Sequence, residues 1–436
     1  MRALIRFVRW KGAVSLVVLL AAGLWLPAGA GAQPAISLEK KIEALERQLN
    51  SLKKELQAVR SEQRAQKAKA ASQAKEIGSI KDLKKSVEEL SKISISGGVT
   101  GIVEGTSGVK SSQTGDDTFA VGSFDLVFEY KPKDNILFVL DLEGIGGDGP
   151  DSLISTLSGL NDDAGSTEDN VTVLEAYIEA VLFQDRFTVT AGKIDMTNYV
   201  DGNALAGDET SQFLATAFVN NAVLSAPDNA PGVRGRFDLV PDLLYVEAGV
   251  MSQDVDANGR TSDRLFNDVY GAVEVGVTPK LFGRQGAYRV WGFLDGAGRE
   301  VRRSGKVEDF TASGGGVSFD QEIADWLGVF FRFGARDSSN LNYNTNSAWS
   351  AGAELSGFIP GRGNDALGGA YGEVKPAKRD SGLTSVSNER LFEIYYRYNF
   401  AEDFHLTAFV QNVTNRLGNS RADDITAFGL RLQLNF

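Results

Sequence analysis

Charged side chains recur at every second position in several segments of the chain, with apolar residues between them. On a strand, this spacing places the charges on one face. The acids expected to face inward are Asp125, Glu129, Asp141, Glu143, Glu175 and Glu179, and the bases are Arg234, Arg236, Arg289, Arg332, Arg397 and Arg431. An acidic wall that confronts a basic wall orders water and favours polar neutral solutes. The alternative for each residue is an ordinary solvated charge.

Four aromatic side chains fall on the same inward-facing positions: Tyr177, Tyr245, Trp291 and Tyr395. An aromatic ring in a channel offers a flat surface on which a sugar ring can stack. Aromatic residues near strand ends also form the girdles at the two membrane interfaces, which is the alternative interpretation.

One histidine and no cysteine exclude disulfides, thiolate metal sites and any reaction that needs two histidines. No serine lies on the strand of His405 or on the final strand, and no GxSxG motif occurs, so we interpret His405 as a pore-lining or rim residue. The acidic loop Asn161–Asn170 lacks the EF-hand spacing, which favours a solvated loop over a cation site. We predict no enzymatic activity, no cofactor, no metal site and no nucleic-acid partner.

The C-terminal segment Ile425–Phe436 shows the period of two most clearly. Phe428, Leu430, Leu432, Leu434 and Phe436 share one face, and polar or small residues share the other. Such a strand suits a wall between lipid and water, and strands in hydrocarbon must close into a cylinder. A terminal strand that ends in phenylalanine resembles the recognition signal of bacterial outer-membrane barrels.

Short and long polar connections alternate after residue 93, and eight long ones predict about sixteen antiparallel strands. We therefore expect residues 93–436 to form an all-β transmembrane barrel with a water-filled lumen, its short turns facing the periplasm. The connection 195–232 is unusually long and carries the apolar patches Phe213-Leu214 and Phe218-Val219. We expect it to fold inward as a constriction loop.

Residues 1–32 read as a secretory signal peptide, with basic residues, one apolar run and small residues before a cleavage site at Gln33. Residues 33–92 carry leucine and other apolar residues alternately three and four positions apart from Leu38, which predicts a self-associating α-helical coiled coil on the periplasmic side. This apolar seam does not determine how many helices associate. From Leu38 to Lys92 there are 14 basic and 9 acidic residues, so the rod carries +5.

Several short segments together resemble the carbohydrate-selective porin family (OprB). They are Gly192-Lys193-Ile194-Asp195, Asp201-Gly202-Asn203, Gln212-Phe213, Gly286-Ala287-Tyr288-Arg289, Phe319-Asp320-Gln321-Glu322, Leu327–Arg332, and Pro360-Gly361-Arg362 with Asp365 and Gly368. The resemblance covers about residues 93–436 and implies a sixteen-stranded bacterial outer-membrane barrel, bounded by lipid, that admits small carbohydrates or other small solutes.

The N-terminal coil is similar to the extensions that hold three porin barrels together or reach the cell wall, which implies a homotrimer and a peptidoglycan partner. Two alternatives to a carbohydrate porin remain at this stage. One is a general or ion-selective porin. The other is a structural tether between outer membrane and peptidoglycan, which the +5 charge of the rod favours.

Overall fold

The computed structural model describes residues 36–436, apart from residues 111–114, 165–169, 225, 228, 254–264, 302–305, 338–342 and 378–386. The expected signal peptide therefore lies outside the described residues. The chain divides into two compact units, Met1–Ser86 and Val87–Phe436, and each is described by itself.

The described part of the first unit is helical: helix α1 (Ile36–Leu90) is one uninterrupted run of 55 residues, whose last turn belongs to the second unit. The expected helix is thus confirmed. The side chains of Leu45, Leu49 and Leu52 are 64%, 52% and 54% exposed in the single chain. Leucines so exposed in water favour a partner helix, and the coiled coil stays a prediction. No helix within the described ranges is long and apolar enough to cross a bilayer.

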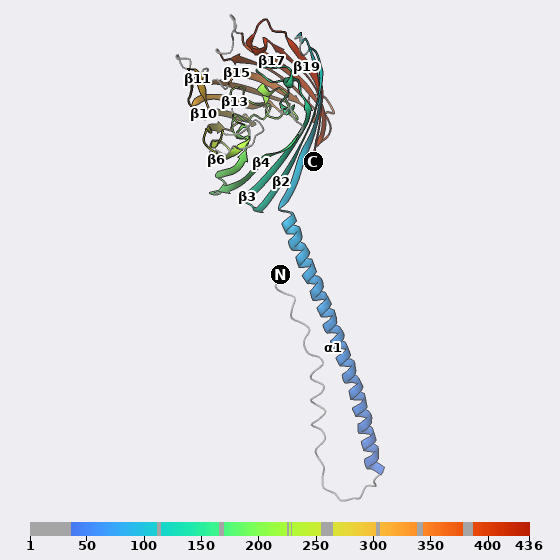
Figure 1. The fold of residues 1–436 in the computed structure, drawn as a ribbon. Coiled ribbons are helices and arrows are strands. Elements are labelled where there is room, and N and C mark those ends of the chain that lie inside the picture. Colours follow the sequence, from blue (N-terminus) through green and yellow to red (C-terminus); the bar gives the residue numbers. More distant parts are fainter. Residues whose placement is uncertain are drawn as a thin grey trace. The chain divides into compact units, whose positions relative to one another are not determined.

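Sixteen long strands form a closed antiparallel barrel, as the sequence predicted (Figure 1). They are β1 (Ile93–Ser107), β2 (Thr118–Lys133), β3 (Ile136–Asp148), β4 (Asn170–Leu182), β5 (Phe187–Ile194), β6 (Ala230–Val240), β7 (Leu244–Ser252), β8 (Val269–Val277), β10 (Arg284–Asp295), β13 (Ala312–Ala324), β14 (Leu327–Arg336), β15 (Thr345–Ser356), β16 (Ala366–Pro376), β17 (Glu389–Ala401), β18 (Phe404–Thr414) and β19 (Ile425–Asn435).

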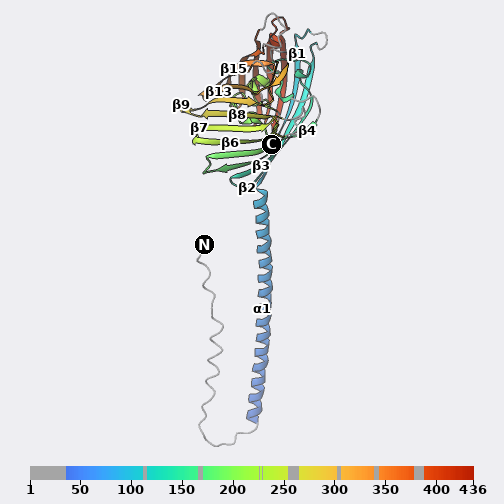
Figure 2. The same cartoon turned by 60° about the vertical axis from the view of Figure 1, so that its left-hand side comes forward.

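Each barrel strand pairs with its neighbours in the sequence, so that β6, β7 and β8 lie side by side (Figure 2). The barrel closes where β1 pairs with β19, in a register that runs from Gly98↔Asn435 to Ser107↔Thr426. A two-residue strand, β9 (Lys280–Leu281), extends the β8–β10 hairpin. Strands β11 (Arg299–Val301) and β12 (Val307–Asp309) form a separate hairpin in a long connection.

Short and long connections alternate as expected, with the long ones on the side opposite the start of β1. The short turn between β13 and β14 consists of Asp325-Trp326. Outward positions are apolar: on β19, Phe428, Leu430 and Leu434 are 50%, 51% and 46% exposed, as suits a surface in contact with lipid.

The described residues of two long connections, called loop 149–169 and loop 195–229 below, fold into the barrel. They contain the short helices η1 (Pro150–Ser152), η2 (Asp162–Ala164), η3 (Met196–Asn198) and α2 (Thr216–Val219); η4 (Arg416–Gly418) lies between β18 and β19. Phe213 and Phe218 are at most 1% exposed, and the Phe213 ring packs edge-on against Tyr395 at 5.0 Å. The expected inward fold of the 195–232 connection is confirmed. The barrel therefore encloses an apolar core between loop and wall, which the sequence had not predicted.

Candidate functional site

The inner faces of β2, β3 and β4 carry acids that face one another across neighbouring strands. Asp125 lies directly opposite Glu143, and Asp141 lies directly opposite Glu175. Like charges at opposed positions repel each other. Among the described residues, no lysine or arginine forms an ion pair with Asp125, Asp141 or Glu143, and all three are partly exposed inside the barrel. This part of the inner wall therefore has an excess of negative charge.

The remaining acids of these strands have polar partners. Glu175 is 8% exposed and accepts a hydrogen bond from the backbone N–H of Asp195 at 2.8 Å. Glu129 accepts one from the Ser94 hydroxyl at 2.9 Å, near the short-turn end of β2. Acids that accept hydrogen bonds therefore adjoin Asp125, Asp141 and Glu143 on the same wall.

The arginines of β6 stand next to acids rather than across the lumen from them. The Arg234 guanidinium lies 3.5 Å from Glu179 and donates to Glu247 of β7. Arg236 lies 3.8 Å from Glu247 and covers the ring of Tyr245, with its guanidinium carbon 3.8 Å from the ring centre. The expected opposition of an acidic and a basic wall therefore does not apply to β6.

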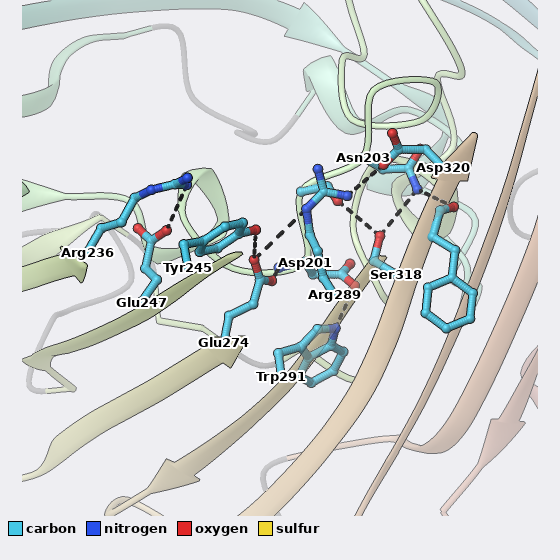
Figure 3. A network of polar contacts seen from close by, with 12 residues as sticks. Asp201, Asn203, Arg236, Tyr245, Glu247, Glu274, Arg289, Trp291, Ser318 and Asp320 are labelled. Atoms are coloured by element: carbon cyan, nitrogen blue, oxygen red, sulfur yellow. Dashed lines mark hydrogen bonds and ion pairs between the residues drawn. The ribbon is translucent and has the colours of Figure 1, made fainter. Parts of the chain in front are cut away.

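A polar network continues over β7, β8, β10 and β13 and fixes the start of loop 195–229 (Figure 3). The Tyr245 hydroxyl donates to Glu274 Oε1 at 2.7 Å, and Glu274 Oε2 accepts the backbone N–H of Asp201 at 2.8 Å. Trp291 Nε1 donates to Asp201 Oδ1 at 2.7 Å. Arg289 donates to Asp320 at 2.6 Å. Asp201 has a φ of +68, a backbone conformation that residues other than glycine rarely adopt. The contacts of its backbone and side chain stabilise this conformation.

Arg332 on β14 also binds the loop 195–229. Its Nε lies 3.1 Å from Asp201 Oδ2, and its Nη2 donates to the Asp201 carbonyl at 2.9 Å. Its Nη1 donates to the carbonyl of Phe218. Arg332 is 2% exposed, so this guanidinium holds the loop to the wall and does not face open lumen.

The far part of the loop is held by β17 and β19 in the same way. Arg431, 1% exposed, donates to the carbonyls of Glu209 and Gln212 at 2.5 and 2.8 Å, and Arg397 donates to that of Ser211 at 2.7 Å. Glu393 accepts the N–H groups of Leu214 and Ala215 at 2.7 and 3.0 Å. Charged side chains thus satisfy backbone groups that the buried loop could not otherwise pair.

Three of the four candidate stacking aromatics are buried. Tyr245, Trp291 and Tyr395 are 5%, 4% and 1% exposed, and the Tyr395 hydroxyl donates to Glu354 at 2.5 Å. They support the loop and the wall, and their faces are not open to a solute. Tyr177 differs, because it is partly exposed on β4 between Glu175 and Glu179. It also lies level with Gly192 of β5, where a Cβ atom would collide with the Ala176 carbonyl and with Cα and Cβ of Tyr177.

Loop 149–169 packs against loop 195–229, with backbone hydrogen bonds from Asp162 to Leu214 and from Ala217 to Ser158. Together the two loops cover the inward faces of β14 and β16–β19, where nearly every inward side chain is buried. His405 belongs to this covered set at 5% exposed, so it does not line open lumen. The open part of the lumen therefore borders β2–β4 with their unpaired carboxylates.

The expected acidic loop 161–170 is only partly described, since Glu168 and Asp169 lie outside the described residues. Asp163 is 9% exposed and accepts the Ser123 hydroxyl at 2.8 Å. Burial raises the pKa of Asp163, and the hydrogen bond from Ser123 acts in the opposite direction. Within the described ranges, no group of three or more His, Cys, Asp or Glu side chains is arranged to hold a metal ion.

Sequence reasoning assigned no role to Asp201 and Glu393, which organise the inward loop. Glu393 could have been found, because the alternation over Leu391–Phe400 places it on the inward face with Tyr395 and Arg397. Asp201 lies in a loop without periodicity, so only its place in the Asp201-Gly202-Asn203 segment singled it out.

Replacing Arg332 by methionine is expected to release the loop. Removing one partner of a buried ion pair costs about 3–5 kcal/mol. Hydrogen exchange of loop amides should therefore accelerate, and single-channel conductance should rise. Arg284→Met, which removes an ion pair with the exposed Asp325, is the matched control and should change neither. Native conductance in a folded Arg332→Met barrel would contradict the anchoring role.

Comparison with known proteins places this geometry in a family. The model of the family described as "Carbohydrate-selective porin, OprB family" matches residues 134–436. An uncharacterized protein of Aquifex aeolicus (strain VF5) is 25% identical over 265 residues, which cover 61% of this chain and 68% of that protein.

Solved structures agree in fold. The high-pH structure of Pseudomonas putida OprB has a TM-score of 0.68 at 16% identity, covering 80% of this chain and 96% of that one. The low-pH structure has a TM-score of 0.52 at 13% identity, covering 80% and 95%. Because the family model spans more than half of the sequence, the chain belongs to the OprB family of carbohydrate-selective porins.

Proposed function

We propose that the protein lets small hydrophilic solutes, preferentially carbohydrates, diffuse passively through the barrel. The family and the closed barrel support an outer-membrane porin. The observation that carries the finer proposal is the unpaired acidic wall of β2–β4 beside the inward loops. Asp125, Asp141 and Glu143 present acceptors to the hydroxyl donors of a sugar, and Tyr177 offers a ring beside them. The other pore-lining candidates are Glu129, Glu175, Glu179, Arg236, Arg289 and Arg397.

Liposome swelling tests the transport proposal. Liposomes that contain the purified full chain should swell in isosmotic solutions of monosaccharides and disaccharides, and swelling should slow as the sugar becomes larger. Protein-free liposomes are the control. No swelling in sugars, amino acids or salts would refute the transport proposal and favour the alternative of a structural tether between outer membrane and peptidoglycan. Equal rates for sugars and salts of the same size would favour a general porin.

The acidic wall should exclude anions. We expect the double variant Asp125→Asn, Glu143→Gln to lower the K⁺/Cl⁻ permeability ratio about two- to fivefold, which corresponds to about 0.4–1 kcal/mol of lost cation stabilisation. The reversal potential in a KCl gradient measures the ratio. Asp134→Asn, in the exposed β2–β3 turn, is the matched control. An unchanged ratio in the double variant would remove these two carboxylates from the conduction path.

We further propose that residues 1–32 are a cleaved signal peptide and that α1 is a periplasmic coiled coil that holds three chains together. The exposed apolar seam supports association. Under the tether alternative, the +5 charge of the rod binds peptidoglycan. Sedimentation of the full chain with purified peptidoglycan compares the two roles, since a tether should co-sediment and a trimerising coil need not.

Replacing Leu45, Leu49 and Leu52 by asparagine should reduce the trimer to monomers, measured by light scattering in detergent, because the apolar seam is lost. Asparagine at Ala44, Gln48 and Ser51, outside the seam, provides the control. Deleting residues 38–92 should have the same effect and leave liposome swelling intact. An unchanged oligomer mass after the deletion would refute the coil's role.

A further inference from the structure

Three buried side chains beneath loop 149–169 carry oxygen atoms without a hydrogen-bond donor. They are Glu104 of β1, Asn161 of the loop and Gln411 of β18, exposed by 1%, 4% and 0%. The unpartnered atoms are Glu104 Oε1, Asn161 Oδ1 and Gln411 Oε1. A buried acceptor without a donor costs about 1–3 kcal/mol, and a charged one costs more. Three such atoms on neighbouring groups indicate a binding partner.

The amide groups of this cluster are fixed in orientation. Asn161 Nδ2 donates to Glu104 Oε2 at 3.1 Å, and Gln411 Nε2 donates to the carbonyl of Leu160 at 2.8 Å. Turning either amide over would set its oxygen against another acceptor. The atoms left over are therefore oxygens in both cases. Asn161 bonds Glu104, and Gln411 bonds the carbonyl of Leu160, the residue before Asn161, so the three side chains meet at one point of the loop.

The cluster is also negatively charged. No described lysine or arginine forms an ion pair with Glu104. Gln411 Nε2 also lies 3.2 Å from Glu393 Oε2, which adds a second buried carboxylate to the same region. A buried carboxylate without a counter-charge is strongly unfavourable. A ligand that fits this cluster must carry positive charge and must bind through oxygen atoms alone.

These requirements select a hard cation. Calcium binds six to eight oxygens from carboxylates, amide carbonyls and water in flexible geometry. Zinc prefers nitrogen and sulfur ligands, and magnesium demands a near-ideal octahedron. Between Glu104 and Gln411, β19 contributes only the small residues Gly429 and Ala427, level with Glu104 and Gln411 respectively. The ring of Phe409 on β18 packs over Gly429 beside Glu104, so the carboxylate and the Gln411 amide meet above this ring, at the loop.

We propose that Glu104, Asn161 and Gln411 form a calcium site that ties loop 149–169 to the wall across the β1–β19 closure. The ligand set is one carboxylate and two amides, so it differs from the acidic loop considered in the sequence and shares only Asn161 with it. The site does not depend on which solute passes through the barrel. It keeps the loop inside the barrel and links strands from both ends of the β-domain.

Calcium titration of the full chain in detergent tests the proposal. Isothermal calorimetry should show one saturable site per chain, and calcium chloride should raise the melting temperature. Glu104→Gln should weaken binding at least tenfold and remove the thermal shift, whereas Asp134→Asn, an exposed carboxylate, should retain both. Asn161→Ala should weaken binding less, because it removes a neutral ligand.

Two results would overturn the site. Equal calcium affinity in native protein and in folded Glu104→Gln would assign the binding to other carboxylates. Absence of saturable binding in the native chain would mean that water or a proton satisfies these oxygens. Heat-modifiable electrophoretic migration reports folding, and Asn161→Ala decides the question if Glu104→Gln does not fold. Liposome swelling in the same preparations separates loss of calcium from loss of transport.

Discussion

Every backbone N–H and C=O of a chain in hydrocarbon must find a partner within the protein, and this requirement determines the rest of the structure. It makes the strands close on themselves through β1 and β19. Closure in turn separates an outer apolar face from an inner face that tolerates charge. Because two long loops also enter the barrel, their own backbone groups must be paired, and the wall supplies that pairing with charged side chains.

The inner wall consequently has two kinds of charge. Arg332, Arg431 and Glu393 are almost fully buried and bind backbone groups of loop 195–229. Asp125 and Glu143 are partly exposed and oppose each other, and Lys193 is the cation that acts on Glu143. The buried charges determine the shape of the lumen by holding the loop. The partly exposed carboxylates determine the electric field inside the lumen. The same network also explains why Tyr245 and Trp291 are unavailable to a solute, since their polar atoms serve the loop.

The strands were predictable because a wall between lipid and water has a period of two, and each strand carries that period in its own residues. The inward direction of Arg332 and Arg431 followed from the same rule. Their function did not, because alternation cannot distinguish an arginine that faces water from one covered by a loop that is distant in sequence. Asp201 was beyond reach for a related reason: its position depends on Glu274, Trp291 and Arg332, which come from three different strands.

The pairing of β1 with β19 also bears on how the barrel is assembled. Gly98 and Asn435 are partners, although almost the entire β-domain separates them in sequence. Every other pair of neighbouring barrel strands is joined by a single connection, so these hairpins can form locally, whereas the closing contact carries the largest loop-closure entropy of the fold. Until it forms, the edges of β1 and β19 remain open to other strands. Closure is therefore the step at which we expect folding to be slowest and misassembly between chains to compete most strongly.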